Sequence, residues 1–350
     1  MAFHSESLTA PGIAPVLSGQ AGRVLLTGAR GFTGHYVRAE LQAAGYQVID
    51  AVAETALPAP LAATAAHALV SNLAPSSAQT STQISTQTSA PTPTLAEQVA
   101  LDITSLEHCR DVMQAVRPDY LIHLAAISFV GHADAEAFYR VNVIGTLNLL
   151  QAMADTGVAP RRVVLASSAN IYGNAAAGIL AEAQPPAPIN HYAMSKLAME
   201  YLVKPWCERF PVVVTRPFNY TGVGQGAQFL VPKIVSHFVA RAPVIELGNL
   251  DVERDFSDVR TVARVYRELL QADCAGQTVN ICSGQPYSLR DIIAMMESIA
   301  GYAIEVRDNP AFVRANEVKT LVGSTARLHA LVGQHGHIPL QETLRWMARE

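Results

Sequence analysis

Residues 23–53, RVLLTGARGFTGHYVRAELQAAGYQVIDAVA, decide the fold class of this chain. The apolar run RVLLT (23–27) predicts a strand that ends at a glycine. The following residues repeat apolar positions with the period of a helix and stop at Gly45, and YQVIDAVA (46–53) predicts a second strand. A strand, a helix and a strand in this order are expected to form a right-handed unit with parallel strands.

Three glycines separate the first predicted strand from the predicted helix. Their spacing, Gly28, Gly31 and Gly34, permits a tight turn and lets backbone N–H groups approach a pyrophosphate at the helix N-terminus. Glycines also mark ordinary turns, but here a strand precedes them and a helix follows. We therefore expect a nucleotide-binding turn, and its candidate residues are Gly28, Arg30, Gly31, Phe32, Thr33 and Gly34.

The choice between NAD and NADP depends on residues near the adenosine ribose, and the second predicted strand and the glycine turn supply the candidates. Asp50, at the end of that strand, could accept hydrogen bonds from an adenosine ribose, which favours NAD. Glu54 is a rival if the strand runs longer, and Arg30 could instead bind the 2′-phosphate of NADP. The simpler interpretation of Asp50 is a polar residue that closes a strand. The sequence favours NAD(H) slightly over NADP(H).

The rest of the chain alternates strands and helices, which predicts an α/β fold: a Rossmann-type doubly wound parallel sheet followed by a smaller C-terminal α/β lobe. We expect a flexible leader at 1–20, a dinucleotide-binding Rossmann domain at 21–218, and a segment at 219–350 that forms mainly the nucleotide-sugar-binding lobe. Thr55 to Ala96 contains no charged residue and is rich in Ala, Ser, Thr, Gln and Pro. This segment, about 55–96, is expected to be a low-complexity insertion.

Composition excludes several classes of protein. Half of the 350 residues are apolar and 15% are charged, which excludes a wholly disordered chain, a coiled coil and a collagen-like fibre. A net charge of −4 implies no general affinity for nucleic acid. No apolar run is long enough for a membrane span, and the start lacks the pattern of a secretory signal. Four scattered cysteines without metal spacing indicate reduced thiols in a cytoplasmic protein that binds no metal.

A second motif, YAMSK (192–196), combines a phenol and an ammonium group on one helix face. A lysine beside Tyr192 is expected to lower the tyrosine pKa from its ordinary value of about 10, which would make general acid–base chemistry feasible. Tyr–Lys pairs are common on surfaces, so Lys196 gains meaning only with a partner. Ser168 follows a predicted strand and is therefore expected at the carboxyl edge of the sheet, where ligands bind.

Six motifs together resemble the extended short-chain dehydrogenase/reductase superfamily. They are TGARGFTG (27–34), HLAA (123–126), NVIGT (142–146), SSANIYG (167–173), YAMSK (192–196) and RPFN (216–219). The resemblance covers the chain from residue 23 onward, apart from the insertion. It implies a catalytic triad of Ser168, Tyr192 and Lys196, with Asn142 positioning the active site. It also implies a homodimer formed through the helices at 136–157 and 191–209, and cofactor contacts from Asp102, Ile103, Leu124, Ala125 and Ala126.

The C-terminal half resembles the GDP-mannose dehydratase and GDP-6-deoxymannose reductase group. The segments are RPFNYTGVGQ, FLVPKIV, LGNLDVERDFSDV and RANEVKTLVGSTARL. The resemblance implies a GDP-4-keto-6-deoxy-hexose substrate. Without it, Arg254 beside Asp255 would indicate a plain salt bridge. The substrate contacts that it implies, besides Ser168 and Tyr192, are Ser128, Asn170, Asn219, Val231, Lys233, Arg254, Arg314 and Glu317.

One position separates a dehydratase from a reductase. The 4,6-dehydratases of this group place a glutamate two residues after the catalytic serine or threonine, where this chain has Asn170. An amide cannot exchange a proton at neutral pH, so elimination is disfavoured and hydride transfer to a C4 ketone remains. The favoured product is GDP-D-rhamnose. The alternatives that stay open are a GDP-6-deoxy-talose-forming reductase, a nucleotide-sugar 4-epimerase, a GDP-mannose 4,6-dehydratase and a catalytically silent nucleotide sensor.

Overall fold

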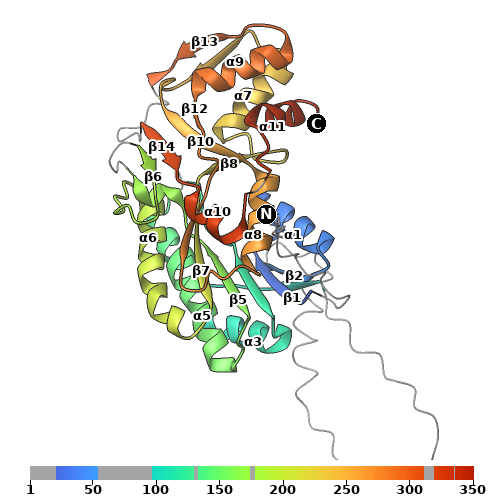
Figure 1. Cartoon of the computed structure of the whole chain (residues 1–350), viewed down its shortest axis with the longest axis vertical. Coiled ribbons are helices and arrows are strands. Elements are labelled where there is room, and N and C mark those ends of the chain that lie inside the picture. Colours follow the sequence, from blue (N-terminus) through green and yellow to red (C-terminus); the bar gives the residue numbers. More distant parts are fainter. Residues whose placement is uncertain (1–20, 54–96, 130–132, 174–177, 311–318, 335) are drawn as a thin grey trace, which may run out of the picture.

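The computed structural model describes residues 21–53, 97–129, 133–173, 178–310, 319–334 and 336–350. The chain forms a larger lobe and a smaller lobe, stacked along the long axis of the molecule (Figure 1). The expected leader and insertion lie outside the described residues, and so do Glu54, Arg314 and Glu317.

A seven-stranded parallel sheet forms the larger lobe and confirms the predicted fold class. Its strand order is β11-β7-β5-β4-β1-β2-β3. The order reverses between β1 and β4, and ligands of such sheets bind beyond the carboxyl ends of the strands at that point. The strands are β1 (Arg23–Thr27), β2 (Gln47–Val52), β3 (Gln98–Ala100), β4 (Tyr120–His123), β5 (Arg162–Ala166), β7 (Val212–Pro217) and β11 (Thr278–Ile281).

Helices cover both faces of this sheet, so alternate side chains of each strand are buried on opposite faces. On one face Leu26 of β1 belongs to the core beneath α1 (Phe32–Ala43) and α8 (Val259–Leu269). On the other face Leu25 belongs to the core beneath α3 (Leu106–Val116), α5 (Gly145–Thr156) and α6 (His191–Val203). Continuous burial explains why these strands read as apolar runs rather than alternating patterns.

Two predicted helices are interrupted. The segment expected as one helix near 136–157 consists of α4 (Ala135–Tyr139), a π-helical turn (Arg140–Ile144) and α5. The helix expected at 191–209 ends as α6 at Val203 and continues as a 3₁₀ turn, Lys204–Glu208, with Pro205 near its start. Proline lacks the N–H that would continue the α-helical hydrogen bonds, which explains the change.

The smaller lobe surrounds strand β10 (Glu253–Asp258), which pairs with β8, β12 and β14. Its core packs α7 and α9 against these strands, with α11 at the end of the chain. The remaining elements are β6 (Ile179–Leu180), β8 (Asn219–Thr221), α7 (Leu230–Val239), β9 (Val244–Leu247), β12 (Pro286–Ser288), α9 (Leu289–Ala300), β13 (Glu305–Asp308), β14 (Thr320–Gly323), α10 (Ala326–Val332) and α11 (Leu340–Met347).

The two lobes are not divided by a single cut near residue 219. After β10 the chain returns to the larger lobe, where α8 packs against α1 (Figure 1). Strand β11 then forms an edge of the parallel sheet. The sequence places α8 and β11 in the C-terminal segment, yet a parallel strand needs a crossover helix, and α8 supplies it. The Rossmann-type sheet is therefore complete only with residues beyond the expected boundary.

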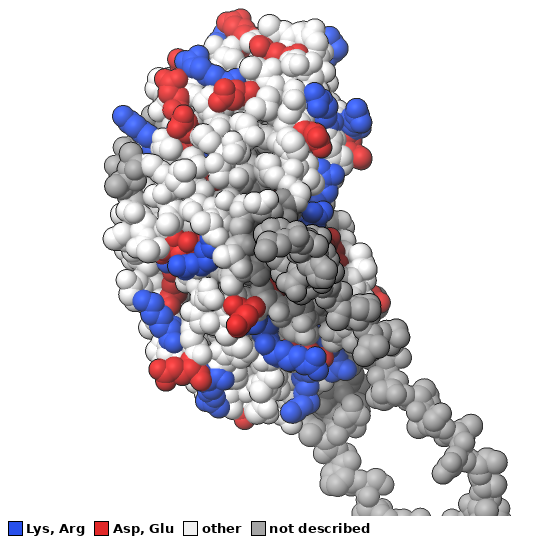
Figure 2. Space-filling view, in the orientation of Figure 1, with Lys and Arg blue, Asp and Glu red and all other residues white. Residues whose placement is uncertain are grey.

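Basic and acidic side chains are interspersed over both lobes on the face shown in Figure 2. Within the described residues, no helix combines the length and the apolar character that crossing a membrane requires.

Candidate active site

A cavity of about 1690 Å³ opens between the two lobes, beyond the carboxyl ends of the central strands. Pockets for a single small molecule measure roughly 300–1,000 Å³, so this cavity can hold two ligands side by side. The larger lobe contributes residues that follow β1, β2, β4 and β5, and the smaller lobe contributes β8, α7 and β10.

The glycine turn forms one end of the cavity. Gly28 has φ +74°, and a Cβ there would lie 2.7 Å from the backbone nitrogen of Ala125. A Cβ at Gly34 would overlap the carbonyl oxygen of Gly28. The first turn of α1 lines the cavity, and its N–H groups suit a pyrophosphate. The predicted cofactor residues that line the cavity are Gly28, Arg30, Gly31, Phe32, Thr33, Gly34, Asp102, Ile103, Leu124, Ala125 and Ala126.

Asp50 is the exception among the predicted cofactor residues. Asp50 is only 2% exposed and does not line the cavity. Its Oδ2 lies 3.2 Å from Nη1 of Arg38 on α1, because Asp50 faces the α1 side of the sheet. Burial raises the pKa of this carboxyl group, and the Arg38 charge opposes that shift. Val52, two residues later, lines the cavity instead, so the argument for NAD from Asp50 is wrong.

The predicted triad comes together at the cavity wall. Ser168 follows β5 and caps the 3₁₀ turn Ala169–Tyr172, and Tyr192 lies in the first turn of α6. All three side chains line the cavity, although each residue is at most 8% exposed. The Lys196 ammonium donates a hydrogen bond to the carbonyl oxygen of Ala166 at 2.7 Å. The Asn170 side chain donates to the Ser168 hydroxyl at 3.2 Å.

The pKa values of the triad are set by burial. Burial raises the pKa of Tyr192 to about 12, although a hydrogen bond with Ser168 opposes the shift. Burial lowers the pKa of Lys196 to about 8, opposed by the charge of Glu200. The pKa of Tyr192 thus shifts in the direction opposite to the expected lowering, because burial outweighs the other influences on the phenol. The phenol is therefore protonated at neutral pH.

Asn142 connects the cavity wall to α6, the helix that carries Tyr192 and Lys196. It lies in the π-helical turn and is fully buried. Its Oδ1 accepts from the Ile127 backbone N–H at 2.9 Å, and its Nδ2 donates to Ser195 Oγ at 3.1 Å. Ser195 donates in turn to the Tyr192 carbonyl oxygen. Asn142 thus fixes the cavity segment after β4 and the start of α6 in one network.

His123 is buried between two threonines and plays no acid–base part. Its ring nitrogens lie 2.6 Å from Thr27 Oγ1 and 3.0 Å from Thr146 Oγ1. Burial, together with the Lys196 charge, lowers the pKa of this imidazole to about 3, so it is neutral at physiological pH. The sequence-based interpretation of a packed sheet histidine agrees with this geometry.

Among the described residues that line the cavity, Asp102 is the only carboxylate. It follows β3, the edge strand, whereas Ser168 follows β5, four strands away in the sheet. With strands about 4.8 Å apart, this separation is roughly 19 Å. Asp102 therefore lies at the far end of the cavity from Tyr192 and Ser168.

The predicted substrate residues that the structure describes line the other half of the cavity. Arg254 reaches it from β10, while Asp255, the next residue, points to the opposite face. Asp255 instead accepts hydrogen bonds from the backbone N–H groups of Ser283 and Gly284. The plain salt bridge between Arg254 and Asp255, which these two residues would indicate without the resemblance, is therefore not formed. The described substrate candidates are Ser128, Ser168, Asn170, Tyr192, Asn219, Val231, Lys233 and Arg254, and all of them line the cavity.

Tyr220 is a cavity residue that the sequence did not single out. Its hydroxyl lies 2.7 Å from Thr33 Oγ1, and its ring stacks on Phe32 with centroids 6.1 Å apart. It thereby joins the smaller lobe to the glycine turn. The only signal in the sequence is its position directly after Asn219.

Comparisons with known proteins agree with this geometry. The family model described as "NAD dependent epimerase/dehydratase family" matches residues 24–282. A GDP-6-deoxy-D-talose 4-dehydrogenase of Aggregatibacter actinomycetemcomitans is 39% identical over 67% of this chain and 79% of its own length. A GDP-6-deoxy-D-mannose reductase of Pseudomonas aeruginosa is 37% identical over 65% of this chain and 78% of its own length.

A solved structure, RMD from Pseudomonas aeruginosa complexed with NADPH, has a TM-score of 0.72 and 29% sequence identity. The similarity covers 94% of this chain and 96% of that chain. Together with the family model, which matches more than half of the residues, these similarities establish the family. The chain is an NAD(P)-dependent enzyme, and it belongs to the NAD dependent epimerase/dehydratase family.

Proposed function

We propose that this enzyme reduces the C4 ketone of GDP-4-keto-6-deoxy-D-mannose to GDP-D-rhamnose. The observation that carries the proposal is that Tyr192, a phenol that is protonated at neutral pH, and Ser168 line the same cavity, which has room for two ligands. The names of the two similar proteins, both of which act on GDP-6-deoxy sugars, support this substrate class.

The triad supplies what a ketone reduction needs. A bound nicotinamide cofactor supplies the hydride. Tyr192 donates its proton to the C4 oxygen as negative charge develops there, and its raised pKa keeps that proton in place at neutral pH. Ser168 donates a hydrogen bond to the same oxygen. The Lys196 ammonium places a positive charge at the site and, as the resemblance implies, binds the nicotinamide ribose.

The same site does not support a 4,6-elimination. That reaction needs a further acid–base group near C5 and C6 of the sugar. The group at the corresponding place is the Asn170 amide, which is hydrogen-bonded to Ser168. Asp102, the carboxylate of the described cavity wall, is roughly 19 Å away. A reductase therefore fits the residues better than a dehydratase.

The second candidate is reduction from the opposite face, which would give the talose epimer. The 39% identity to a GDP-6-deoxy-D-talose 4-dehydrogenase favours it. The test converts GDP-mannose with a GDP-mannose 4,6-dehydratase, adds this enzyme with NADPH or NADH, and identifies the product by NMR. We expect GDP-D-rhamnose with one cofactor oxidised per sugar. A persistent 4-keto sugar would contradict the substrate, product without cofactor oxidation would indicate an epimerase, and turnover of GDP-mannose alone would contradict the Asn170 argument.

We also propose that NADPH is the preferred cofactor and that Arg30 binds its 2′-phosphate. Arg30 lines the cavity, whereas the residues at the end of β2 that line it, Ala51, Val52 and Ala53, carry no carboxylate for a ribose hydroxyl. The NADPH held by the similar Pseudomonas structure supports this preference. An ionic hydrogen bond of about 1.5–3 kcal/mol corresponds to roughly ten- to a hundredfold. Arg30→Ala should lower kcat/KM for NADPH by that factor and leave NADH little changed; an equal loss for both would refute the assignment.

A homodimer through α6 is a further part of the proposal. Three large apolar residues on this side of the larger lobe are 43–48% exposed, namely Met194 and Leu202 of α6 and Ile144 of the neighbouring π-helical turn. Covering them with a second copy would remove apolar surface from water. Light scattering should give twice the chain mass for the wild type and a lower mass for Leu202→Glu. A monomeric wild type would refute the dimer.

A further inference from the structure

The cavity loop, residues 221–229, runs from the last residue of β8 to α7, two elements of the smaller lobe. Residues 224–229 line the cavity, beside Arg254 of the smaller lobe. Gly224 has φ +82°, and a Cβ at Gly226 would overlap the Gln228 side chain, so the loop turns tightly at its glycines. Gln225 ties the turn to its own start, because it accepts from Thr221 Oγ1 at 2.7 Å and donates to the Tyr220 carbonyl oxygen at 3.2 Å. These bonds fix the shape of the turn, whereas its position over the cavity depends on what packs behind it.

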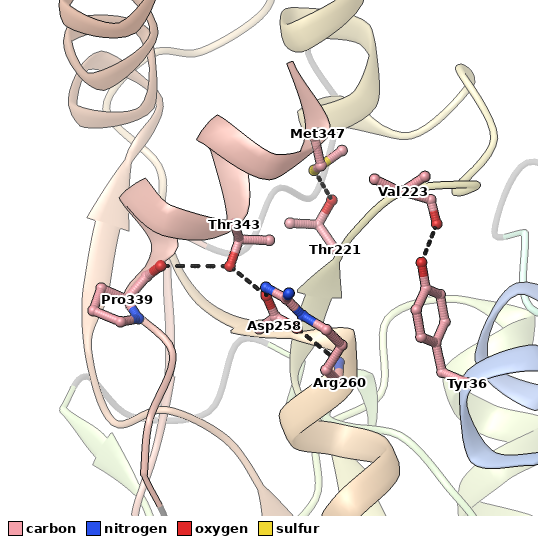
Figure 3. A network of polar contacts seen from close by, with 8 residues as sticks. All are labelled: Tyr36, Thr221, Val223, Asp258, Arg260, Pro339, Thr343 and Met347. Carbon is pink, nitrogen blue, oxygen red and sulfur yellow. Dashed lines mark hydrogen bonds and ion pairs between the residues drawn. The ribbon is translucent and has the colours of Figure 1, made fainter. Parts of the chain in front are cut away.

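The back of the cavity loop rests on α11 and α1. A Cβ at Gly222 would lie 3.1 Å from Cζ3 of Trp346, which shows how closely the backbone approaches that ring. Thr221 Oγ1 donates to Oε1 of Gln225 within the loop at 2.7 Å and also lies 3.6 Å from Sδ of Met347. The Tyr36 hydroxyl donates to the Val223 carbonyl oxygen at 2.7 Å (Figure 3). Trp346 and Tyr36 also meet edge to face, with ring centroids 6.0 Å apart.

A buried carboxylate holds α11 in this position. The Asp258 side chain is fully buried at the junction of β10 and α8. Its Oδ2 accepts hydrogen bonds from Thr343 Oγ1 on α11 and from Nη2 of Arg260, both at 2.7 Å (Figure 3). The Arg260 guanidinium then lies 3.9 Å from the centre of the Trp346 ring. Asp258 thus fixes both α11 and the cation that covers Trp346.

We propose that α11 is a positioning element of the active site, which holds the cavity loop in the conformation that binds the nucleotide-sugar. None of its residues lines the described cavity wall, so it acts only through the loop. Tyr220, which precedes the loop, has anchors of its own in Thr33 and in the pairing of β8 with β10. Cofactor binding should therefore be unaffected by a substitution that weakens the contact between α11 and the cavity loop.

The first test is amide hydrogen exchange in Trp346→Ala, measured by mass spectrometry on the full chain. Without the ring, we expect the amides of the cavity loop to exchange about tenfold faster or more. Leu149→Ala is the matched control, because Leu149 is fully buried but lies on α5, in the core of the larger lobe and away from α11. It should lower Tm as much or more and leave loop exchange unchanged. Unchanged loop exchange in Trp346→Ala, or equal acceleration in Leu149→Ala, would overturn the proposal.

The second test is kinetic, and this part rests on the proposed function. Trp346→Ala should raise KM for the GDP-4-keto sugar about tenfold, because a displaced loop misplaces the bound sugar, while the Kd for NADPH stays within about twofold. Trp346→Phe, which keeps an aromatic ring against Gly222, should restore most of the affinity. If the wild type does not reduce this sugar, the proposed function fails, yet hydrogen exchange still decides whether α11 holds the loop.

Gly222→Ala tests the same contact from the side of the loop, should Trp346→Ala fail to fold. The added Cβ would lie 2.5 Å from Cγ1 of Val259 and close to Trp346, so the loop must move away from α11. We expect faster exchange in the cavity loop, a raised KM for the sugar and unchanged exchange in α11. A normal KM together with normal loop exchange in this variant would refute the positioning role.

Discussion

The two halves of the cavity are built in different ways. The half of the cavity in which we place the cofactor, the cofactor half, comes from short motifs, each of which follows a strand of one parallel sheet, such as the glycine turn after β1 and Leu124–Ala126 after β4. The half in which we place the nucleotide-sugar, the sugar half, combines α7, β10 and the cavity loop, whose backbone packs closely against Trp346 of α11. The first half is determined by local sequence, whereas the second depends on contacts between residues more than a hundred positions apart.

The largest expected effect is at the point where the two halves meet. Tyr192→Phe removes the proton donor, so we expect kcat to fall about a thousandfold while both ligands still bind. Tyr201→Phe is a suitable control, because Tyr201 lies on the same helix and is 55% exposed. Stopped-flow measurement of hydride transfer and titration of NADPH binding check the prediction. Undiminished turnover would contradict the enzyme mechanism and would favour a nucleotide-sensing role.

The sequence predicted the parallel sheet and most of the residues that line the cofactor half of the cavity. Strand β1 begins and ends where RVLLT does, and the glycine turn and the triad lie where their motifs placed them. The sequence-based predictions were wrong where contacts between distant parts of the chain determine where a residue or an element lies. Asp50 turns to Arg38 because of the side of the sheet on which it lies, and α8 and β11 return to the larger lobe. Tyr220 and α11 act through contacts with Thr33 and Gly222 that no local pattern records.

Arg254→Ala tests whether the two halves are energetically independent. Arg254 lines the sugar half, where a guanidinium suits the phosphates or the base of a nucleotide. Losing an ionic hydrogen bond should raise KM for the GDP-sugar roughly ten- to a hundredfold, with kcat and the NADPH Kd nearly unchanged. Steady-state kinetics with each ligand varied in turn provides the measurement. A comparable loss of NADPH affinity would mean that the halves are coupled more tightly than their construction indicates.

The pH dependence of turnover reports on the cofactor half alone. Burial lowers the pKa of Lys196 to about 8, so its ammonium form disappears as the pH rises through that value. Because the charged form holds the ribose and favours negative charge at the site, kcat should fall about tenfold per pH unit above pH 8. Tyr192, with a pKa near 12, stays protonated over this range. A flat profile from pH 7 to pH 10 would show that the Lys196 charge is not needed.

The smallest expected effect is at Asp50, where the position in the sequence and the position in the structure lead to different predictions for the cofactor preference. If Asp50 bound the ribose, Asp50→Asn would change the ratio of NADPH to NADH efficiency. Because the carboxylate faces Arg38 beneath α1 and does not line the cavity, we expect the ratio to stay within about twofold. The stability should fall by about 1 kcal/mol, since Arg38 keeps Glu97 as a second partner at 3.4 Å. Val52→Asp, by contrast, places a carboxylate at the cavity and should shift the preference toward NADH, so the pair of variants identifies the residue position at which the enzyme distinguishes the two cofactors.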